Sequence, residues 1–167
     1  MKAELVDVQF AYVPDKPILR GVSLALETGQ CVGLMGPSGA GKSTLARHLN
    51  GLLRPSGGAV LLEGRDVRTQ PVAALARHVG YVFQNPLHQL FAQTVREEVG
   101  LALTRGPNPS GRAEAERRVD EMLRALGLED LASRHPLSVS EGQRKRIALA
   151  AVLAARPSFL ILDEPTL

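Results

Sequence analysis

The sequence predicts an α/β fold, in which a mixed β-sheet is accompanied by helices and interrupted by a helical insert. Short apolar runs of strand length recur along the chain, and a glycine-rich loop follows one of them. Segments with helical periodicity gather between about residues 86 and 140. With 167 residues, 44% of them hydrophobic and 22% charged, the chain has the length and composition of one well-filled domain.

Composition and charge narrow the classes of protein to consider. A net charge of +3 is too small to point to a nucleic-acid partner. The single cysteine, Cys31, excludes an internal disulfide and fits a reducing compartment, and its apolar surroundings predict a small buried core residue. Residues 1–13 alternate apolar and polar side chains, unlike a signal peptide. The longest apolar stretch, Ile147–Ala155, is about half as long as a membrane-spanning helix.

The N-terminal region is predicted to form strands. Val6, Val8 and Phe10 alternate with polar residues, so we expect these three side chains on the buried face of one strand. Residues 22–26 repeat the pattern in a second strand. The apolar run Cys31–Met35 predicts a third strand that leads directly into the glycine-rich loop.

The remaining elements alternate between strand-length apolar runs and helical patterns. We predict strands at residues 59–62, 79–83 and 159–162. We predict helices from residue 43 to the turn at 54–58, at 94–104, around the apolar stripe at 119–126, and at 141–155. A loop is expected at 105–111, where glycine and proline cluster.

The glycine-rich loop carries the pattern GxxxxGK[ST] between an expected strand and an expected helix, as this phosphate-binding motif requires. Its glycines let backbone amides turn inward around phosphates, and the N-terminus of the helix favours the anion. Lys42 is expected to reach the β- and γ-phosphates, and the Ser43 hydroxyl to ligate Mg²⁺. The loop therefore predicts a site for ATP with Mg²⁺, formed by Gly36, Ser38, Gly39, Ala40, Gly41, Lys42, Ser43 and Thr44.

Two acids close the apolar strand at 159–162. Ligands gather at the carboxyl ends of parallel strands, so Asp163 and Glu164 are expected to meet the phosphate loop. Asp163 is predicted to hold Mg²⁺ through water, and Glu164 to orient or deprotonate the attacking water. Without the phosphate loop, such a pair would be interpreted as a solvated turn.

Two further segments, Val82–Pro86 and Val139–Gln143, extend the pattern. With them the whole chain resembles an ATP-binding cassette (ABC) ATPase, whose glutamine loop and signature sequence stand at these positions. The resemblance implies a P-loop NTPase core of the RecA-like type with an N-terminal antiparallel β part. It places this core at residues 1–85 and 141–167, and an α-helical subdomain at 86–140 with the signature at its end.

The same resemblance implies roles for individual residues. Gln84 would contact Mg²⁺ or the attacking water, and Tyr12 would stack on adenine. Ser140 and Gly142 would touch the γ-phosphate of ATP bound to a partner subunit, and Gln143 belongs to the same binding segment. Because family members pair head to tail around two nucleotides, a second ATP-binding subunit, identical or different, is the first expected partner.

The signature departs from the usual family pattern at two positions. Val139 replaces a leucine, which is a mild apolar change, and Glu141 replaces a glycine. Two like charges about 4 Å apart repel by roughly 4 kcal/mol at an effective dielectric constant of about 20. Either Glu141 points away from the nucleotide or this half-site is weakened, as would suit a heterodimer with one good and one poor site.

A narrower resemblance is carried by residues 84–91, which are similar to the glutamine-loop region of the ATPase components of energy-coupling factor (ECF) importers of vitamins and transition-metal ions. It implies an ATP-hydrolysing motor subunit at the cytoplasmic face of the cell membrane. An integral membrane partner would insert a coupling helix in a groove near this segment, where Leu87, Leu90 and Phe91 offer apolar side chains. His88 is interpreted as an exposed loop residue and not as a metal ligand.

The family normally continues beyond Leu167 with a dimer-contacting loop, further strands and a switch histidine. We therefore expect a fragment that hydrolyses ATP very slowly or not at all. The alternative function is a soluble ABC ATPase in translation or DNA maintenance, which the modest insert and low net charge disfavour. A P-loop kinase or nucleotide-dependent switch would have no signature before the acidic strand.

Overall fold

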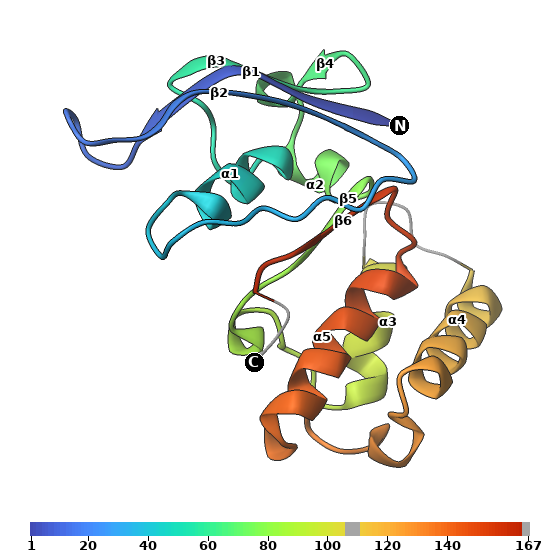
Figure 1. Ribbon diagram of the computed structural model, residues 1–167. Coiled ribbons are helices and arrows are strands. Elements are labelled where there is room, and N and C mark those ends of the chain that lie inside the picture. The colour runs from blue at the N-terminus through green and yellow to red at the C-terminus, as the bar shows by residue number, and fades with distance from the viewer. Residues whose placement is uncertain (106–110, 165–167) are drawn as a thin grey trace. The chain divides into compact units, whose positions relative to one another are not determined.

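The computed structural model describes residues 1–105 and 111–164 (Figure 1). The chain forms two compact units, Met1–Val79 and Gly80–Leu167. Of the loop predicted at 105–111, residues 106–110 lie outside the described residues. The division of the chain into a core and a helical subdomain at residues 86 and 140 stays a prediction.

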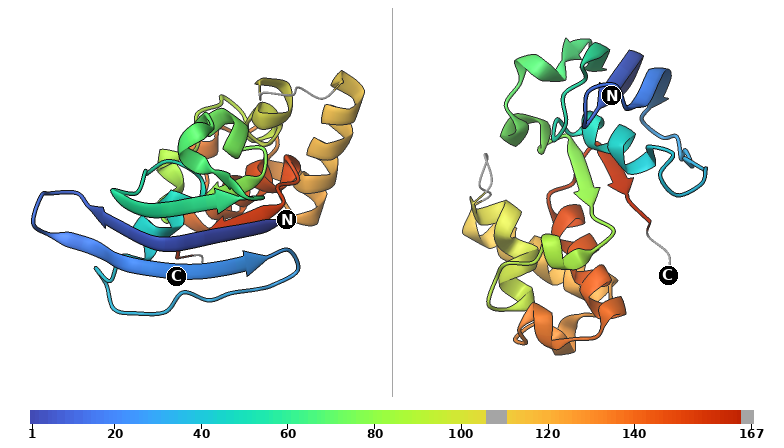
Figure 2. Two further views of the ribbon diagram at one scale, coloured as in Figure 1. Left: turned by 90° about the horizontal axis from the view of Figure 1, so that it is seen from above. Right: turned by 90° about the vertical axis from the view of Figure 1, so that its left-hand side faces the viewer.

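The first unit is built on a four-stranded antiparallel sheet with the order β2-β1-β3-β4. The two long strands β1 (Lys2–Ala11) and β2 (Pro17–Glu27) run side by side, as Figure 2 shows. The other edge of β1 pairs with β3 (Gly57–Leu62), which in turn pairs with the short β4 (Arg65–Asp66). The strands predicted from alternation at the N-terminus and from the apolar run at 59–62 are therefore confirmed.

A β-bulge in β1 makes the prediction for Val6 wrong. Val6 is 49% exposed, whereas Ala3, Leu5 and Val8 are buried. The pairing of β1 with β2 shifts register between Leu5 and Val8, and Asp7 adopts a positive φ of 50°. Because a bulge inserts one extra residue into a strand, it reverses the side to which the next side chains point. The alternation therefore restarts at Val8 instead of continuing through Val6.

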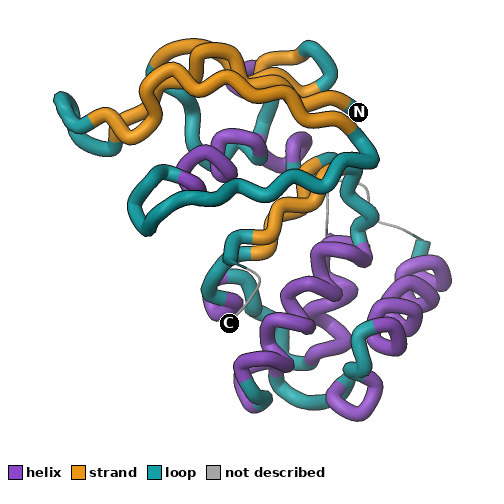
Figure 3. Tube along the Cα trace, viewed as in Figure 1, coloured by secondary structure: helices purple, strands orange, loops and turns teal. Residues whose placement is uncertain are grey.

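The apolar run Cys31–Met35 is not a strand, and that prediction is also wrong. Residues 30–37 form a loop between β2 and α1 (Lys42–Leu49), visible as the long teal segment in Figure 3. Cys31 is exposed and not buried, and Met35 is 94% exposed. An apolar run becomes a strand only where another strand offers hydrogen-bonding groups, and within the described residues this segment pairs with none.

Helices cover the core of the first unit. Five residues of α1 are buried, from Thr44 to Leu49 with the exception of Arg47. The short helices η1 (Val67–Thr69) and α2 (Val72–Leu75) each contribute one buried residue, Val67 and Leu75. The core that results holds α1 at the end of the phosphate loop.

The second unit combines three packed helices with a small sheet of β5 (Val79–Val82) and β6 (Phe159–Leu162). The helices are α3 (Val95–Arg105), α4 (Arg112–Ala125) and α5 (Glu141–Ala154), which pack on one another (Figure 1). Short 3₁₀ turns lie at η2 (Pro86–His88), η3 (Glu129–Leu131) and η4 (Pro136–Ser138). All three helix predictions for this region and the strand at 159–162 are confirmed. Among the described residues, no helix is long and apolar enough to cross a bilayer.

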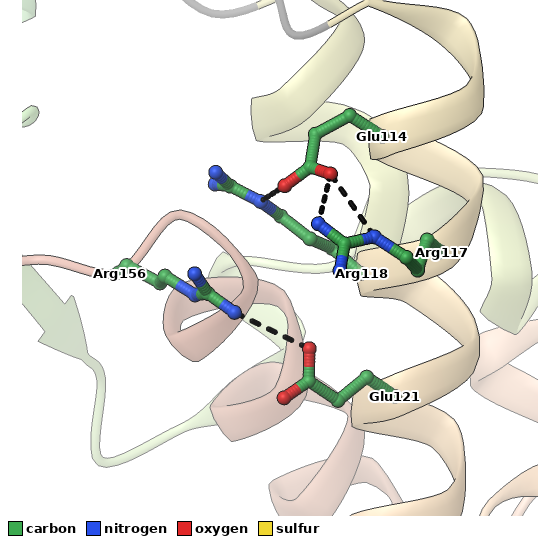
Figure 4. A network of polar contacts seen from close by, with 5 residues as sticks. All are labelled: Glu114, Arg117, Arg118, Glu121 and Arg156. Atoms are coloured by element: carbon green, nitrogen blue, oxygen red, sulfur yellow. Dashed lines mark hydrogen bonds and ion pairs between the residues drawn. The ribbon is translucent and has the colours of Figure 1, made fainter.

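Ion pairs support the surface of α4 (Figure 4). Glu114 accepts hydrogen bonds from the guanidinium groups of Arg117 and Arg118, and these cations lower the pKa of Glu114 to about 2. One turn further on, Arg156 donates to Glu121 at 3.4 Å, which ties the segment after α5 to α4. Arg and Glu at spacings of three and four residues stabilise a helix in this way.

Candidate functional site

The phosphate loop is an exposed turn that ends at α1. Gly39 and Gly41 have φ angles of 81° and 91°, a region that glycine adopts without strain. Gly41 is the N-cap of α1, and its carbonyl accepts the first helical bond from Leu45 N at 2.8 Å. A side chain at Gly41 would also meet Ile18 at 3.0 Å. The glycine pattern therefore has a local cause, which is the sharp entry of the chain into α1.

Lys42 lies across this loop. Its Nζ donates to the carbonyl oxygens of Gly36 at 2.9 Å and Pro37 at 3.0 Å. No carboxylate among the described residues forms an ion pair with Lys42, so its charge is directed at the loop alone. Ser38 and Ala40 are exposed in the loop, and Ser43 is half-buried in the first turn of α1. The loop therefore combines a cation with the N-terminus of α1, where free backbone amides favour an anion.

Tyr12 is joined to α1, the helix that follows the phosphate loop, by a series of contacts between side chains. The Tyr12 hydroxyl lies 3.4 Å from the hydroxyl of Thr44, and its ring meets Phe10 edge-on at 4.9 Å. Phe10 in turn meets His48 edge-on at 4.8 Å, and His48 Nδ1 lies 2.7 Å from the carbonyl oxygen of Thr44. Burial lowers the pKa of His48, so this ring is neutral at pH 7. The exposed Tyr12 is thus braced against α1.

In the second unit, Asp163 follows β6 as predicted. Its backbone N–H donates to the carbonyl oxygen of Val82 at 3.0 Å, which fixes the residue at the end of the sheet. The hydroxyl of Tyr81 donates to Asp163 Oδ2 at 2.8 Å. Tyr81 is 7% exposed, so this donor is held in place by its surroundings. The carboxylate of Asp163 therefore has a defined orientation.

Gln84 and Glu164 meet although they lie 80 residues apart in sequence. Gln84 Nε2 donates to Glu164 Oε2 at 2.5 Å, and both side chains are otherwise exposed. The structure thus brings together the glutamine and the second acid that the sequence had assigned to catalysis. Asp163 directly precedes Glu164 in the chain. The polar residues Gln84, Asp163 and Glu164 thus follow the ends of β5 and β6.

The signature segment forms the start of α5. Ser140 is the N-cap, and its hydroxyl accepts from Gln143 N at 3.3 Å while Gln143 Oε1 accepts from Ser140 N at 2.9 Å. This reciprocal capping box fixes the helix start. Gly142 has open space where a side chain would stand. Glu141 occupies the first turn, where the helix dipole favours an acid.

A hollow of about 370 Å³ lies beside Gln84 in the second unit. Its lining residues are Gln84, Asn85, Pro86, Leu87, Glu141, Arg144, Lys145 and Glu164. Glu141 shares this hollow with two cations, Arg144 and Lys145, and with a second acid, Glu164. Leu87 and Phe91 are exposed nearby in sequence, and Phe91 is 73% exposed. The prediction that Leu90 also faces the groove is wrong, because Leu90 is buried in the core of the helices.

The predicted site residues fall in two groups. Tyr12 and the phosphate loop at 36–44 lie in the first unit, whereas Gln84, Asp163, Glu164 and the signature lie in the second. Each group is assembled within its own unit, as the contacts above describe. That the two groups form one nucleotide site stays a prediction.

Comparison with known proteins now decides the family. A family model described as "ABC transporter" matches residues 19–167. This chain belongs to the ABC transporter family. The matched range includes the phosphate loop and all of the second unit, so both of these parts belong to an ABC ATP-binding domain.

The names of individual relatives indicate the type of transporter more closely than the family model does. An energy-coupling factor transporter ATP-binding protein, EcfA, of Methanocaldococcus jannaschii is 42% identical over 98% of the chain, which spans 58% of that protein. A putative ABC transporter ATP-binding protein of Caldanaerobacter subterraneus is 43% identical over 96% of the chain, which spans 28% of it. The chain thus covers about half or less of these relatives.

Solved structures agree with the fold of the ABC domain. CbiO1 of Clostridium perfringens, described as part of the ABC transporter complex cbiONQ, has a TM-score of 0.85 and 32% identity over 98% of this chain and 65% of that one. The ATP-binding cassette MJ0796, solved as a dimer with ADP and Pi, has a TM-score of 0.86 and 29% identity over 98% of this chain and 74% of that one. The P-loop fold with an antiparallel β part and a helical part is confirmed.

Three residues of the site were not predicted from the sequence. They are Tyr81, which holds Asp163, Gln89, which contacts Phe83 and Ala148, and Glu98, which binds two backbone amides of the segment after the glutamine loop. Helical spacing gives a signal for Glu98, since an acid three residues after Val95 falls on the same face of the helix as that apolar residue. The other two depend on contacts between distant segments.

Proposed function

We propose that the protein to which this chain belongs is the ATP-hydrolysing motor subunit of an ECF-type membrane importer. The contact between Gln84 and Glu164 carries the proposal, because it joins the glutamine loop to an acid that can act as the catalytic base. The 42% identity to an energy-coupling factor ATP-binding protein supports the choice of importer. ATP-driven closure of two such subunits would drive uptake of a vitamin or a metal ion.

The phosphate loop fits ATP with Mg²⁺. Positive φ angles at Gly39 and Gly41 turn backbone amides toward one volume, and Lys42 has no acidic partner there among the described residues. The phosphates would be held by the amides of residues 36–44 and by Lys42. Ser43, Gln84 and Asp163 would hold the metal ion. Mg²⁺ supplies neutralisation of the charge on the phosphates when it is bound.

Hydrolysis needs a base that accepts a proton from water. A carboxylate only accepts hydrogen bonds, and Gln84 donates to one oxygen of Glu164, which leaves the other oxygen free for that proton. Gln84 therefore orients Glu164. Tyr81 helps to orient Asp163 through the hydrogen bond from its hydroxyl to Asp163 Oδ2.

The remaining ligand contacts would come from Tyr12 and from a second subunit. Tyr12 is braced edge-on by Phe10, which leaves a face of its ring open to stack on adenine. The Ser140 hydroxyl accepts from Gln143 N and keeps its own O–H as a donor to a phosphate. Ser140, Gly142 and Gln143 would serve the nucleotide of the partner ATP-binding subunit.

The membrane partner would dock at the hollow beside Gln84, at the cytoplasmic face of the membrane. This hollow joins the glutamine loop to the start of α5 and includes the exposed Leu87. The exposed Phe91 follows four residues later in sequence and lines a separate hollow with residues of α3 and α4. A coupling helix of the partner would pack its apolar face on these exposed apolar side chains.

Purification of the full-length protein from membranes tests the proposal. We expect small hydrophobic membrane proteins to copurify with the wild type and with Val72→Ser, a control at another exposed apolar position. Phe91→Ser should lose them. If no membrane protein copurifies with the wild type and ATP turnover responds to ribosomes or DNA, the soluble alternative replaces the importer.

A further inference from the structure

We infer that Gln89 is a positioning residue that links the glutamine loop to the helix carrying the signature. Gln89 Oε1 accepts from the backbone N–H of Phe83 at 3.2 Å, and Gln89 Nε2 donates to the carbonyl oxygen of Ala148 at 3.3 Å. One side chain therefore bridges the residue before Gln84 and the middle of α5. The inference rests on the proposed function, because it concerns how the candidate catalytic residues are held for ATP hydrolysis.

The segment that carries Gln89 is a stiff turn. Asn85 Oδ1 accepts from Leu87 N at 3.0 Å, and the carbonyl oxygens of Asn85 and Pro86 accept from His88 N and Gln89 N at 3.2 and 3.0 Å. Pro86 further restricts the backbone. A displacement of this turn would therefore move the Gln89 side chain with it.

The far end of the bridge is equally firm. Ala148 is fully buried in the core formed by the three helices, and α5 begins at the capping box of Ser140 and Gln143. A helix transmits displacement along its length because each of its turns is hydrogen-bonded to the next. The start of α5 and the turn before Gln89 are thus connected through Ala148.

The near end of the bridge reaches the reacting groups. Phe83 directly precedes Gln84, and Gln84 donates to Glu164. The N–H of Phe83 is bound by Gln89, so the position of the Gln84 backbone depends on the bridge. Through Gln89, the orientation of Glu164 therefore depends on the position of α5, the helix that begins with the signature.

The outer end of the same segment is held by a buried acid. Glu98 is 2% exposed and accepts from Phe91 N at 2.6 Å and from Ala92 N at 2.7 Å. The exposed Phe91 is therefore fixed to α3, which packs on α5. A partner that displaces Phe91 would move a segment whose inner end is tied to α5 by Gln89.

The chemistry of the bridge requires a carboxamide of this length. The carboxamide of Gln89 offers an acceptor to Phe83 and a donor to Ala148 from two separate atoms, and asparagine is one methylene shorter. Glutamate keeps the acceptor but faces the Ala148 carbonyl with an anion. Glutamate regains a donor only when it is protonated, and an ordinary glutamate is ionised at neutral pH.

The test compares Gln89→Met, Gln89→Glu and the control Gln93→Met in the full-length protein purified with its membrane partners. Gln93 is exposed in the same segment. We expect Gln89→Met to lower kcat for ATP about tenfold or more with an unchanged KM, because Glu164 is misplaced while the phosphate loop is intact. Gln89→Glu should match it at pH 8, where the carboxylate is ionised and cannot donate to the Ala148 carbonyl. In a Gln84→Ala background, Gln89→Met should have no further effect on kcat.

Hydrogen exchange on the same full-length variants separates this inference from the proposed function. Gln89→Met should accelerate exchange of the Phe83 amide and of the first turn of α5, and Gln93→Met should leave both unchanged. A wild-type protein that hydrolyses no ATP would overturn the proposed function, and the exchange rates would still decide the bridge. The inference is overturned if exchange is unchanged in Gln89→Met, or if its kcat equals that of the wild type. Multiplicative effects of Gln89→Met and Gln84→Ala on kcat would also overturn it.

Discussion

The hydrogen bond from Tyr81 to Asp163 gives the sharpest single-atom prediction. Tyr81→Phe removes one hydroxyl and keeps the packed ring, so the fold is preserved. A hydrogen bond to a charged group contributes about 1.5–3 kcal/mol. Because Asp163 is only half-buried and water can replace part of the bond, we take the lower value, about 1.5 kcal/mol, which corresponds to about tenfold in affinity. We therefore expect the Mg²⁺ concentration for half-maximal ATP turnover by the full-length protein to rise about tenfold.

The matched control for this prediction is a double-mutant cycle with Asp163→Asn. That substitution removes the negative charge to which the Tyr81 hydroxyl donates its hydrogen bond. In this background, Tyr81→Phe should therefore change the Mg²⁺ concentration for half-maximal turnover by no more than about twofold. The reasoning is refuted if Tyr81→Phe leaves the Mg²⁺ requirement unchanged. It is refuted equally by the same tenfold rise in both backgrounds.

Three further predictions concern stability, each measured by urea unfolding. Gly58→Ala should lower the unfolding free energy by at least about 3 kcal/mol, because φ is 73° and a side chain would overlap the backbone of β1, whereas Gly29→Ala, with open space around it, should lose about 1 kcal/mol. The pKa of His48 is lowered in the folded protein, so as the pH falls below 6.5 this histidine is protonated more readily in the unfolded chain than in the folded one. Stability should then fall toward low pH by at most about 1.4 kcal/mol per pH unit, and His48→Gln should flatten this slope between pH 5 and 7. The pKa of Glu114 is about 2 against an ordinary 4.5, so its stabilisation should be complete above pH 4.5 and disappear as the pH falls toward 2, with Glu114→Gln flattening that window. An unchanged slope in either of these two variants would contradict the corresponding assignment.

Much of the fold could be predicted from the sequence because its signals are local. The phosphate loop is defined by glycines whose positive φ angles are needed where they stand, as at Gly41. The strand Phe159–Leu162 is an uninterrupted apolar run, and the structure ends it at the residue before Asp163. Helix α4 follows the periodicity of its apolar residues.

The errors arose where the outcome depends on another segment. The bulge that exposes Val6 involves Gly58 of β3, which alone leaves room for the carbonyl oxygens of Val6 and Asp7. The run Cys31–Met35 has the composition of a strand, but composition cannot supply the neighbouring strand that a ladder requires. Leu90 was assigned to the surface by analogy, whereas the helical core buries it.

The candidate site likewise divides into residues that local motifs identify and residues that depend on distant segments. Lys42, Asp163 and Glu164 could be predicted because motifs name them. Tyr81 and Gln89 could not, since Asp163 lies 82 residues from Tyr81, Ala148 lies 59 residues from Gln89, and no pattern marks such pairs. The residues that position the reacting groups are therefore found only in three dimensions.

The central claim is that residues 36–44 bind ATP and that Glu164 acts as the base that accepts a proton from the attacking water. Measuring ATP affinity and turnover on the same full-length protein tests it most directly. We predict that Lys42→Ala weakens ATP binding about ten- to a hundredfold, because it removes charge-assisted hydrogen bonds to phosphate. Glu164→Gln should bind ATP as the wild type does and lose about a hundredfold or more in turnover. Wild-type affinity in Lys42→Ala, or wild-type turnover in Glu164→Gln, would contradict the claim.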